Sequence, residues 1–152
     1  MRVGTLSRKR KLKNDFMNKI EHIGIAVKDL ETSNAVYAQL LGETHYKMEE
    51  VLEQGVKTSF FKVGPNKIEL LEATMPDSPI AKFITRKGEG VHHIAFAVDD
   101  IKEEMDRLRK QGFKLLNEEP QKGADNKLIA FVHPKSASGV LVELCQEIKN
   151  KE

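Results

Sequence analysis

Two segments of the sequence, 71 residues apart, each place a histidine at the start of an apolar run. His22 opens HIGIAVKDL, and His93 opens HIAFAVDDI. Two glutamates repeat in a similar way, because Glu69 lies in KIELLEA and Glu143 lies in VLVELCQE. Imidazole nitrogens and carboxylate oxygens together suit Co²⁺, Mn²⁺, Ni²⁺ or Fe²⁺, whereas structural zinc sites favour cysteine sulfur. These four residues therefore predict one metal site with positions left for water or a substrate.

The residues around the histidines and glutamates support this interpretation. Side chains alternate across a β-strand, so Gly24 and Ala26 share a face with His22, and two alanines share a face with His93. Small residues leave room for a cavity there, while the opposite, bulky faces suit packing against helices. A carboxylate in an apolar strand is costly unless it is paired, protonated or bound to a metal.

A single strand histidine is more often a satisfied polar residue than a metal ligand. Equivalent positions in two copies favour the ligand interpretation for His22 and His93. His92 is expected to point to the face opposite His93, as a structural or supporting residue. His45 and His133 lie outside the repeated positions, and we assign them no functional role.

The elements that must position these residues also repeat. Asp29 and Asp100 each follow a histidine-bearing strand and are candidate N-caps for helices over 30–41 and 101–111. A further short helix is expected over 80–87. Each half then continues with three strand-like segments, which lie at 44–51, 56–64, 66–73, 113–120, 127–134 and 139–147. Each half therefore reads β-α-β-β-β, and the fold class is α+β.

Composition bounds the remaining possibilities. The chain has 152 residues, of which 39% are hydrophobic and 32% charged, as in a globular protein. No apolar run reaches the roughly 18 residues of a membrane span, so no membrane role is expected. The single cysteine, Cys145, excludes an internal disulfide and agrees with a cytoplasmic location.

The positive charge is concentrated at the N-terminus. Residues 1–19 hold seven Lys and Arg but one acidic residue, and the rest of the chain has more acids than bases. An acidic body argues against nucleic-acid binding. We expect a basic, disordered extension over residues 1–18, a single domain over 19–147 and a short tail over 148–152. Within that domain, the expected parts are 19–74, a connection over 75–90, and 91–147.

Several blocks of the sequence resemble the vicinal oxygen chelate superfamily, which includes glyoxalases, bleomycin resistance proteins and dioxygenases. Within it, the chain looks most like the methylmalonyl-CoA epimerases. The resemblance covers residues 19–147. It is carried by EQGV (53–56), IELLEA (68–73), DSPIAKFI (77–84), GVHHIAFAVDDI (90–101), GADNK (123–127), FVHPK (131–135) and GVLVEL (139–144).

The resemblance implies two modules that form a cupped mixed sheet around a metal held by His22, Glu69, His93 and Glu143. Cobalt is the first choice, with Mn²⁺, Ni²⁺, Fe²⁺ or Zn²⁺ as alternatives. It also implies epimerisation of methylmalonyl-CoA at C2 and a homodimer. Glu143 is the leading candidate for the general base, in addition to its role as a ligand.

The second acid or base is less well defined. One form of the family's mechanism uses a glutamate two residues after EQGV, where this chain has Thr58. Glu53 or a metal-bound water is the alternative proton donor, although Glu53 could equally be an ordinary exposed acid. Cations for the CoA phosphates are expected in loops of the second half, at Lys122, Lys127 and Lys135.

Three other functions remain open at this point. A glyoxalase I-type lyase or isomerase would use the same ligands on a hemithioacetal, but the DSPIAKFI block favours an epimerase. An extradiol dioxygenase uses two histidines and one carboxylate around Fe²⁺, so the fourth ligand, Glu69, argues against it. A metal-free binding module of the same fold would have no need for all four ligands.

Overall fold

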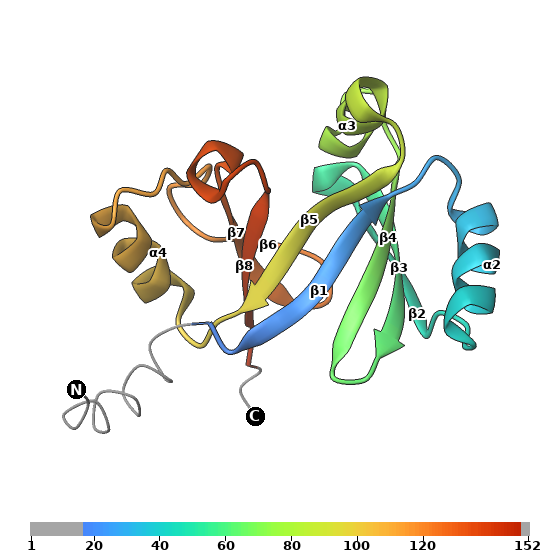
Figure 1. The fold of residues 1–152 in the computed structure, drawn as a ribbon, viewed down its shortest axis with the longest axis horizontal. Coiled ribbons are helices and arrows are strands. Elements are labelled where there is room, and N and C mark those ends of the chain that lie inside the picture. The colour runs from blue at the N-terminus through green and yellow to red at the C-terminus, as the bar shows by residue number, and fades with distance from the viewer. Residues whose placement is uncertain (1–16, 150–152) are drawn as a thin grey trace. The chain divides into compact units, whose positions relative to one another are not determined.

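The computed structural model describes residues 17–149 (Figure 1). These residues divide into two compact units. One unit spans residues 21–94, and the other combines residues 95–149 with the described residues before Glu21. Most of the predicted basic extension, residues 1–16, lies outside the described part of the chain. Within the described residues, no helix is long and apolar enough to cross a membrane.

The unit of residues 21–94 is a sheet with helices beside it. Its strand order is β2-β3-β4-β1-β5, with β1 parallel to β4 and the β2, β3 and β4 neighbours antiparallel. The strands are β1 (Lys19–Ala26), β2 (Lys47–Val51), β3 (Val56–Val63), β4 (Asn66–Ala73) and β5 (Gly90–Ala97). The other elements are α2 (Leu30–Leu41), the 3-10 turn η1 (Leu52–Gln54) and α3 (Pro79–Lys87).

Helix α2 covers one face of this sheet (Figure 1). Val27 and Leu30 pack there against Phe61 of β3 and Leu70 of β4, and all four side chains are buried. The bulky face of the first histidine strand therefore packs against a helix, as the alternation of its residues predicted. The histidine side of β1 is the other face.

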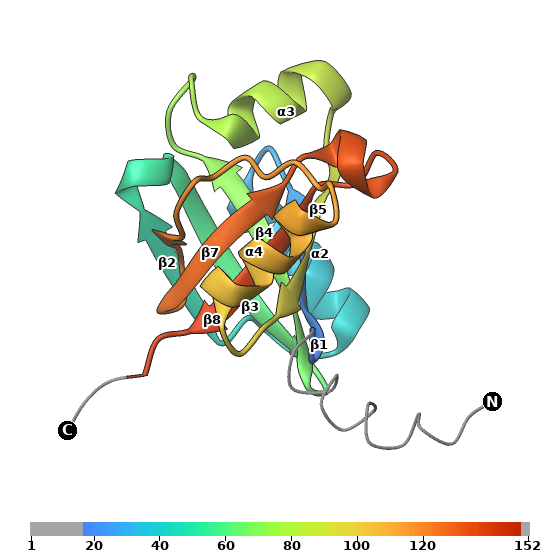
Figure 2. The ribbon, with the colours of Figure 1, turned by 90° about the vertical axis from the view of Figure 1, so that its left-hand side faces the viewer.

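The second unit repeats this arrangement with α4 (Ile101–Lys110). Its strand order is β5-β8-β7-β6, and its remaining elements are β6 (Gln121–Lys122), β7 (Lys127–Val132), the turn η2 (Pro134–Ala137) and β8 (Val142–Glu147). Helix α4 lies over β7 and β8 (Figure 2) and buries Ile101, Met105 and Leu108. The predicted apolar stripe and the α+β class with two β-α-β-β-β modules are confirmed.

The two units share an equivalent hydrogen bond at the start of α2 and of α4. The amide of the first helical residue donates to a side-chain oxygen at 2.8 Å in each unit, from Leu30 to Glu72 and from Ile101 to Gln146. Glu72 and Gln146 each come three residues after one of the predicted glutamate ligands. Equivalent residues of the sequence repeat therefore make the same contact at the start of each helix.

The N-caps follow the same pattern. The Asp29 carboxylate accepts the amide hydrogen of Thr32 at 3.1 Å, and the Asp100 carboxylate accepts that of Glu103, also at 3.1 Å. Ser78 caps α3 by accepting the amide hydrogen of Ala81. Helices α2 and α4 therefore begin at the predicted residues, and α3 begins one residue earlier than predicted, at Pro79.

One predicted strand is wrong. Residues 113–120 form only an isolated bridge, between Leu115 and Val132, and a two-residue strand follows at Gln121–Lys122. The Arg109 guanidinium binds the carbonyl oxygens of residues 117 and 118 at 3.0 Å, so these acceptors serve a side chain and not a neighbouring strand. Pro120 also has no amide hydrogen to donate.

Candidate metal centre

His22 of β1 and His93 of β5 meet inside the unit of residues 21–94. Both side chains are buried, at 4% and 6% exposure, and their Nε2 atoms are 3.1 Å apart. The rings meet edge to face, with centroids 5.2 Å apart. The two histidines that the repeat singled out are therefore in direct contact.

Gly24 makes this contact possible. A Cβ atom at Gly24 would lie 2.2 Å from Cε1 of His93, which is far inside van der Waals contact. Small residues on the histidine face were expected to leave room for a cavity. At Gly24, that room is taken by the His93 ring itself.

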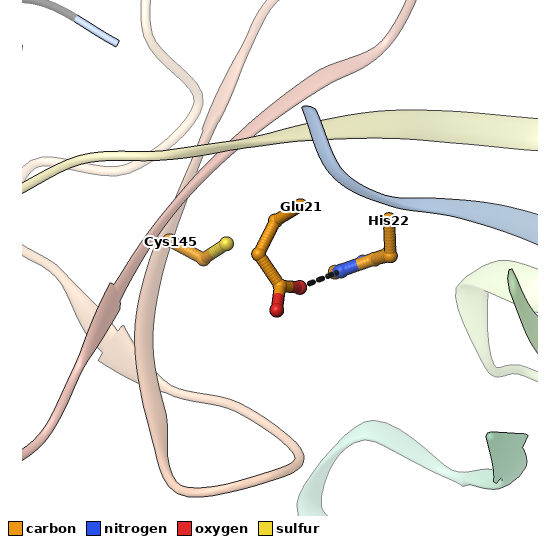
Figure 3. A group of neighbouring side chains, drawn as sticks. All are labelled: Glu21, His22 and Cys145. Atoms are coloured by element: carbon orange, nitrogen blue, oxygen red, sulfur yellow. Dashed lines mark hydrogen bonds and ion pairs between the residues drawn. The ribbon is translucent and has the colours of Figure 1, made fainter. Parts of the chain in front are cut away.

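The other nitrogen of His22 faces a carboxylate. Glu21 Oε1 lies 2.6 Å from Nδ1 of His22, and Figure 3 shows this carboxylate turned toward the ring. The second oxygen of Glu21 accepts a hydrogen bond from Nζ of Lys67 at 2.6 Å. Burial alone raises the pKa of Glu21, but the hydrogen bonds and charges of His22 and Lys67 outweigh it and lower that pKa to about 2.

The other nitrogen of His93 faces a second imidazole. Nδ1 of His93 lies 2.9 Å from Nδ1 of His92, and the His92 ring packs edge to face on Phe83 with centroids 4.9 Å apart. Strand alternation placed His92 on the opposite face, yet its ring still reaches its neighbour. His92 is therefore placed to support His93.

These contacts determine which nitrogens can bind a cation. An ionised carboxylate only accepts hydrogen bonds, so Nδ1 of His22 carries a proton, and in the neutral ring Nε2 is the nitrogen that presents a lone pair. When His93 donates through Nδ1 to His92, its Nε2 also presents a lone pair. Two lone pairs 3.1 Å apart are favourable only when a proton or a cation lies between them. This donor set fits a divalent metal, and such outer partners commonly orient metal-binding histidines.

The predicted carboxylates lie in different units. Glu69 of β4 is 5% exposed, its Cα pairs in register with that of Gly24, and its Oε2 lies 3.3 Å from Nδ1 of His22. Glu143 of β8, in the unit of residues 95–149, is also 5% exposed and pairs with Phe131 of β7. Three of the four predicted ligands therefore form one buried cluster of histidine and glutamate, which is consistent with a divalent metal site.

The remaining predicted site residues are more exposed. Glu53 lies exposed on η1, and Lys122 and Lys135 are exposed on β6 and η2. Lys127 is half-buried, and its ammonium group lies 3.4 Å from the Asp125 carboxylate. Their roles toward a substrate stay predictions.

Sequence reasoning missed Glu21 and Lys67. An acid next to a repeated histidine was visible in the sequence, but strand alternation directs neighbouring side chains to opposite faces. Lys67 gave no signal, because its position beside His22 depends on the β1–β4 register, in which the two residues pair.

A pocket of about 490 Å³ lies elsewhere in this unit, at the start of α2. Its lining includes Asp29, Tyr37 and Glu89. Asp29 caps α2, and the Glu89 carboxylate accepts the amide hydrogen of Lys28 at 2.7 Å. These acids serve the backbone, and the histidine cluster remains the candidate site.

Comparison with known proteins identifies the family of the chain. Residues 21–131 match the model of the glyoxalase/bleomycin resistance protein/dioxygenase superfamily. The chain is 42% identical to the uncharacterised protein YqjC of Bacillus subtilis, over 86% of this chain and 93% of that protein. It is 40% identical to the mitochondrial methylmalonyl-CoA epimerase of Homo sapiens, over 86% of this chain and 74% of that protein.

A solved structure extends the comparison to three dimensions. A variant of Streptomyces coelicolor methylmalonyl-CoA epimerase in complex with 2-nitronate-propionyl-CoA superposes with a TM-score of 0.85 at 36% sequence identity. The match covers 88% of this chain and 100% of that chain. The chain therefore belongs to the glyoxalase/bleomycin resistance protein/dioxygenase superfamily and, within it, is similar to the methylmalonyl-CoA epimerases.

Proposed function

We propose that this protein is a divalent-metal-dependent epimerase that inverts C2 of methylmalonyl-CoA. The metal requirement is proposed from the Nε2 atoms of His22 and His93, which are buried and 3.1 Å apart. Nδ1 of each ring contacts a second side chain, Glu21 or His92, which orients the ring. The substrate part is supported by relatives named as methylmalonyl-CoA epimerases at about 40% identity.

The proposed ligands are His22, His93, Glu69 and Glu143, with cobalt as the first choice of metal. Glu143 enters through its equivalence to Glu69 in the sequence repeat. When bound, a divalent cation would act as a Lewis acid toward the thioester oxygen. Burial keeps both carboxylates away from bulk water, so pairing with a cation is their natural compensation.

The residues of the chain supply the proton transfer. The hydrogen at C2 lies between a thioester and a carboxylate, so it is weakly acidic. We assign its removal to the Glu143 carboxylate, and return of a proton from the opposite face inverts the centre. Glu53, which lies exposed on η1, stays the candidate for that second proton donor.

The direct test is proton NMR in D₂O with methylmalonyl-CoA and the full chain, first stripped of metal and then reloaded with Co²⁺. We expect deuterium to replace the hydrogen at C2 only in the reloaded protein. The exchange should be lost in Glu143→Ala. Glu147→Ala is a matched control, because it removes an exposed glutamate from the same strand.

Two outcomes would contradict the proposal. Tight metal binding without exchange at C2 would favour a glyoxalase I-type lyase or isomerase, which a hemithioacetal assay would then identify. Absence of metal binding would leave a binding module of the same fold.

Three further predictions accompany the proposed function. A homodimer is expected, and light scattering after size-exclusion chromatography would measure its molecular mass.

Lys122, Lys127 and Lys135 are proposed contacts of the CoA phosphates, so their replacement by alanine should raise KM more than it lowers kcat. A cytoplasmic location is proposed from the absence of a disulfide framework, and fractionation of cells would test it.

A further inference from the structure

Thr58 of β3 carries a buried hydroxyl group that has no hydrogen-bond partner. The residue is 1% exposed, and its Oγ1 has no partner among residues 17–149. The next residue, Ser59, is 0% exposed, and its hydroxyl is also without a partner in this part of the chain. A buried hydroxyl without a partner is unfavourable, so each one calls for an explanation.

The two hydroxyl groups lie on opposite faces of β3. Ser59 pairs with Leu70, which belongs to the core beneath α2. Thr58 pairs with Leu71, which lies two residues along β4 from Glu69 and therefore shares its face. Thr58 thus faces the side of the sheet that carries the histidine cluster, whereas Ser59 faces the helix.

Thr58 is also close to the cluster along the sheet. Phe60 pairs directly with Glu69, so Thr58 is the diagonal neighbour of Glu69 across the two strands. Diagonal neighbours in an antiparallel pair are about 7–8 Å apart, a separation that one small bound group can bridge. A substrate oxygen beside Glu69 would therefore come within reach of the Thr58 hydroxyl.

We propose that the Thr58 hydroxyl donates a hydrogen bond to an oxygen of the bound acyl group. This inference rests on the proposed function, because that function supplies a substrate whose acyl end carries thioester and carboxylate oxygens. A threonine hydroxyl donates a hydrogen bond readily but does not take up a proton as a carboxylate does. Thr58 is therefore a binding group and not a general base.

The test compares Thr58→Val with Ser59→Ala in the full, cobalt-loaded chain. Valine keeps the shape of threonine and removes the hydroxyl, and Ser59→Ala removes an equally buried hydroxyl from the opposite face. Isothermal titration would measure the affinity for 2-nitronate-propionyl-CoA and, separately, for CoA alone. We expect Thr58→Val to weaken binding of the acyl analogue about tenfold and to leave CoA binding unchanged. Ser59→Ala should change neither affinity.

Thermal unfolding separates a binding role from a structural one. Each variant removes an unpartnered buried hydroxyl, so neither melting temperature should fall. Equal affinity of Thr58→Val and wild type for the analogue would overturn the role of Thr58 and leave the epimerase proposal intact. An equal loss in Ser59→Ala would also overturn it, because the effect would then come from strand packing. Failure of the wild type to bind the analogue would contradict both proposals.

Discussion

His22 and His93 occupy equivalent places in the two copies of the repeat, yet different groups hold them. Nδ1 of His22 faces the carboxylate of Glu21, which also binds Lys67. Nδ1 of His93 faces the imidazole of His92. The two copies therefore share the inner histidine and differ in the group behind it.

The difference has an electrostatic consequence. An anionic partner at Nδ1 increases the basicity of the opposite nitrogen more than a neutral imidazole does. His22 should therefore be the stronger donor to a cation, and His93 should depend more on correct placement of its ring.

The largest effect is expected from removing either histidine. His22→Ala and His93→Ala should each lower the affinity for Co²⁺ by more than about a hundredfold, since loss of an outer partner alone commonly costs 10–100-fold. Equilibrium dialysis of Co²⁺ would measure this. His45→Ala is the matched control, because His45 packs edge to face on Phe61 in the same unit. Near-normal cobalt binding by either histidine variant would contradict a shared site.

Gly24→Ala should affect His93 specifically. The added methyl group would overlap the His93 ring, so we expect weaker cobalt binding and a free energy of unfolding lower by about 1–3 kcal/mol. Urea unfolding would measure the second quantity. In a His93→Ala background the same substitution should cost little stability, because the overlapping ring is gone. An equal cost in both backgrounds would show that the strain has another source.

A smaller effect on cobalt affinity is expected from replacing the partners of the Nδ1 atoms, Glu21 and His92. Glu21→Gln should weaken cobalt binding about tenfold, and His92→Phe should weaken it less, because only Glu21 supplies a negative charge. The d–d absorption spectrum of bound Co²⁺ should shift in Glu21→Gln, a change that a general loss of stability does not produce. Glu72→Gln is the control, since Glu72 binds the amide of Leu30. A larger effect at His92 than at Glu21 would reverse the comparison.

The smallest effect concerns the pH dependence of the α2 cap. Hydrogen bonds from the Thr32 hydroxyl and amide hold the pKa of Asp29 below its ordinary value of 3.8. A lowered pKa in the folded state means that the cap contributes stability above about pH 4 and loses it as the pH falls further. Asp29→Asn should flatten this part of the profile, as measured by urea unfolding at several pH values. If the free energy of unfolding of Asp29→Asn fell with pH as steeply as that of the wild type, the role of the Asp29 cap would be contradicted.

The sequence predicted the fold well because the repeat provided two observations of each element. Both helix caps, both histidine strands and the apolar stripe of α4 follow from local patterns, and the structure confirms them. The strand expected over 113–120 was wrong because the carbonyl groups of residues 117 and 118 bind Arg109. That side-chain contact has no local signature.

The candidate site was less predictable than the fold. The residue types of the inner cluster were visible, but the contact of His22 with His93 depends on strand pairing. Lys67 comes beside His22 only because β1 and β4 are parallel in one particular register. The importance of Gly24 likewise appears only once the His93 ring is placed against it.

The central claim is that His22 and His93 bind one divalent metal together through Nε2. The most direct measurement is the X-ray absorption spectrum of the Co²⁺-loaded full chain, in which imidazole ligands produce characteristic multiple scattering. We predict one cobalt per chain with two imidazoles and additional oxygen ligands, and one imidazole fewer in His93→Ala. A cobalt shell of oxygen atoms alone, or a spectrum that does not change in His93→Ala, would contradict the claim.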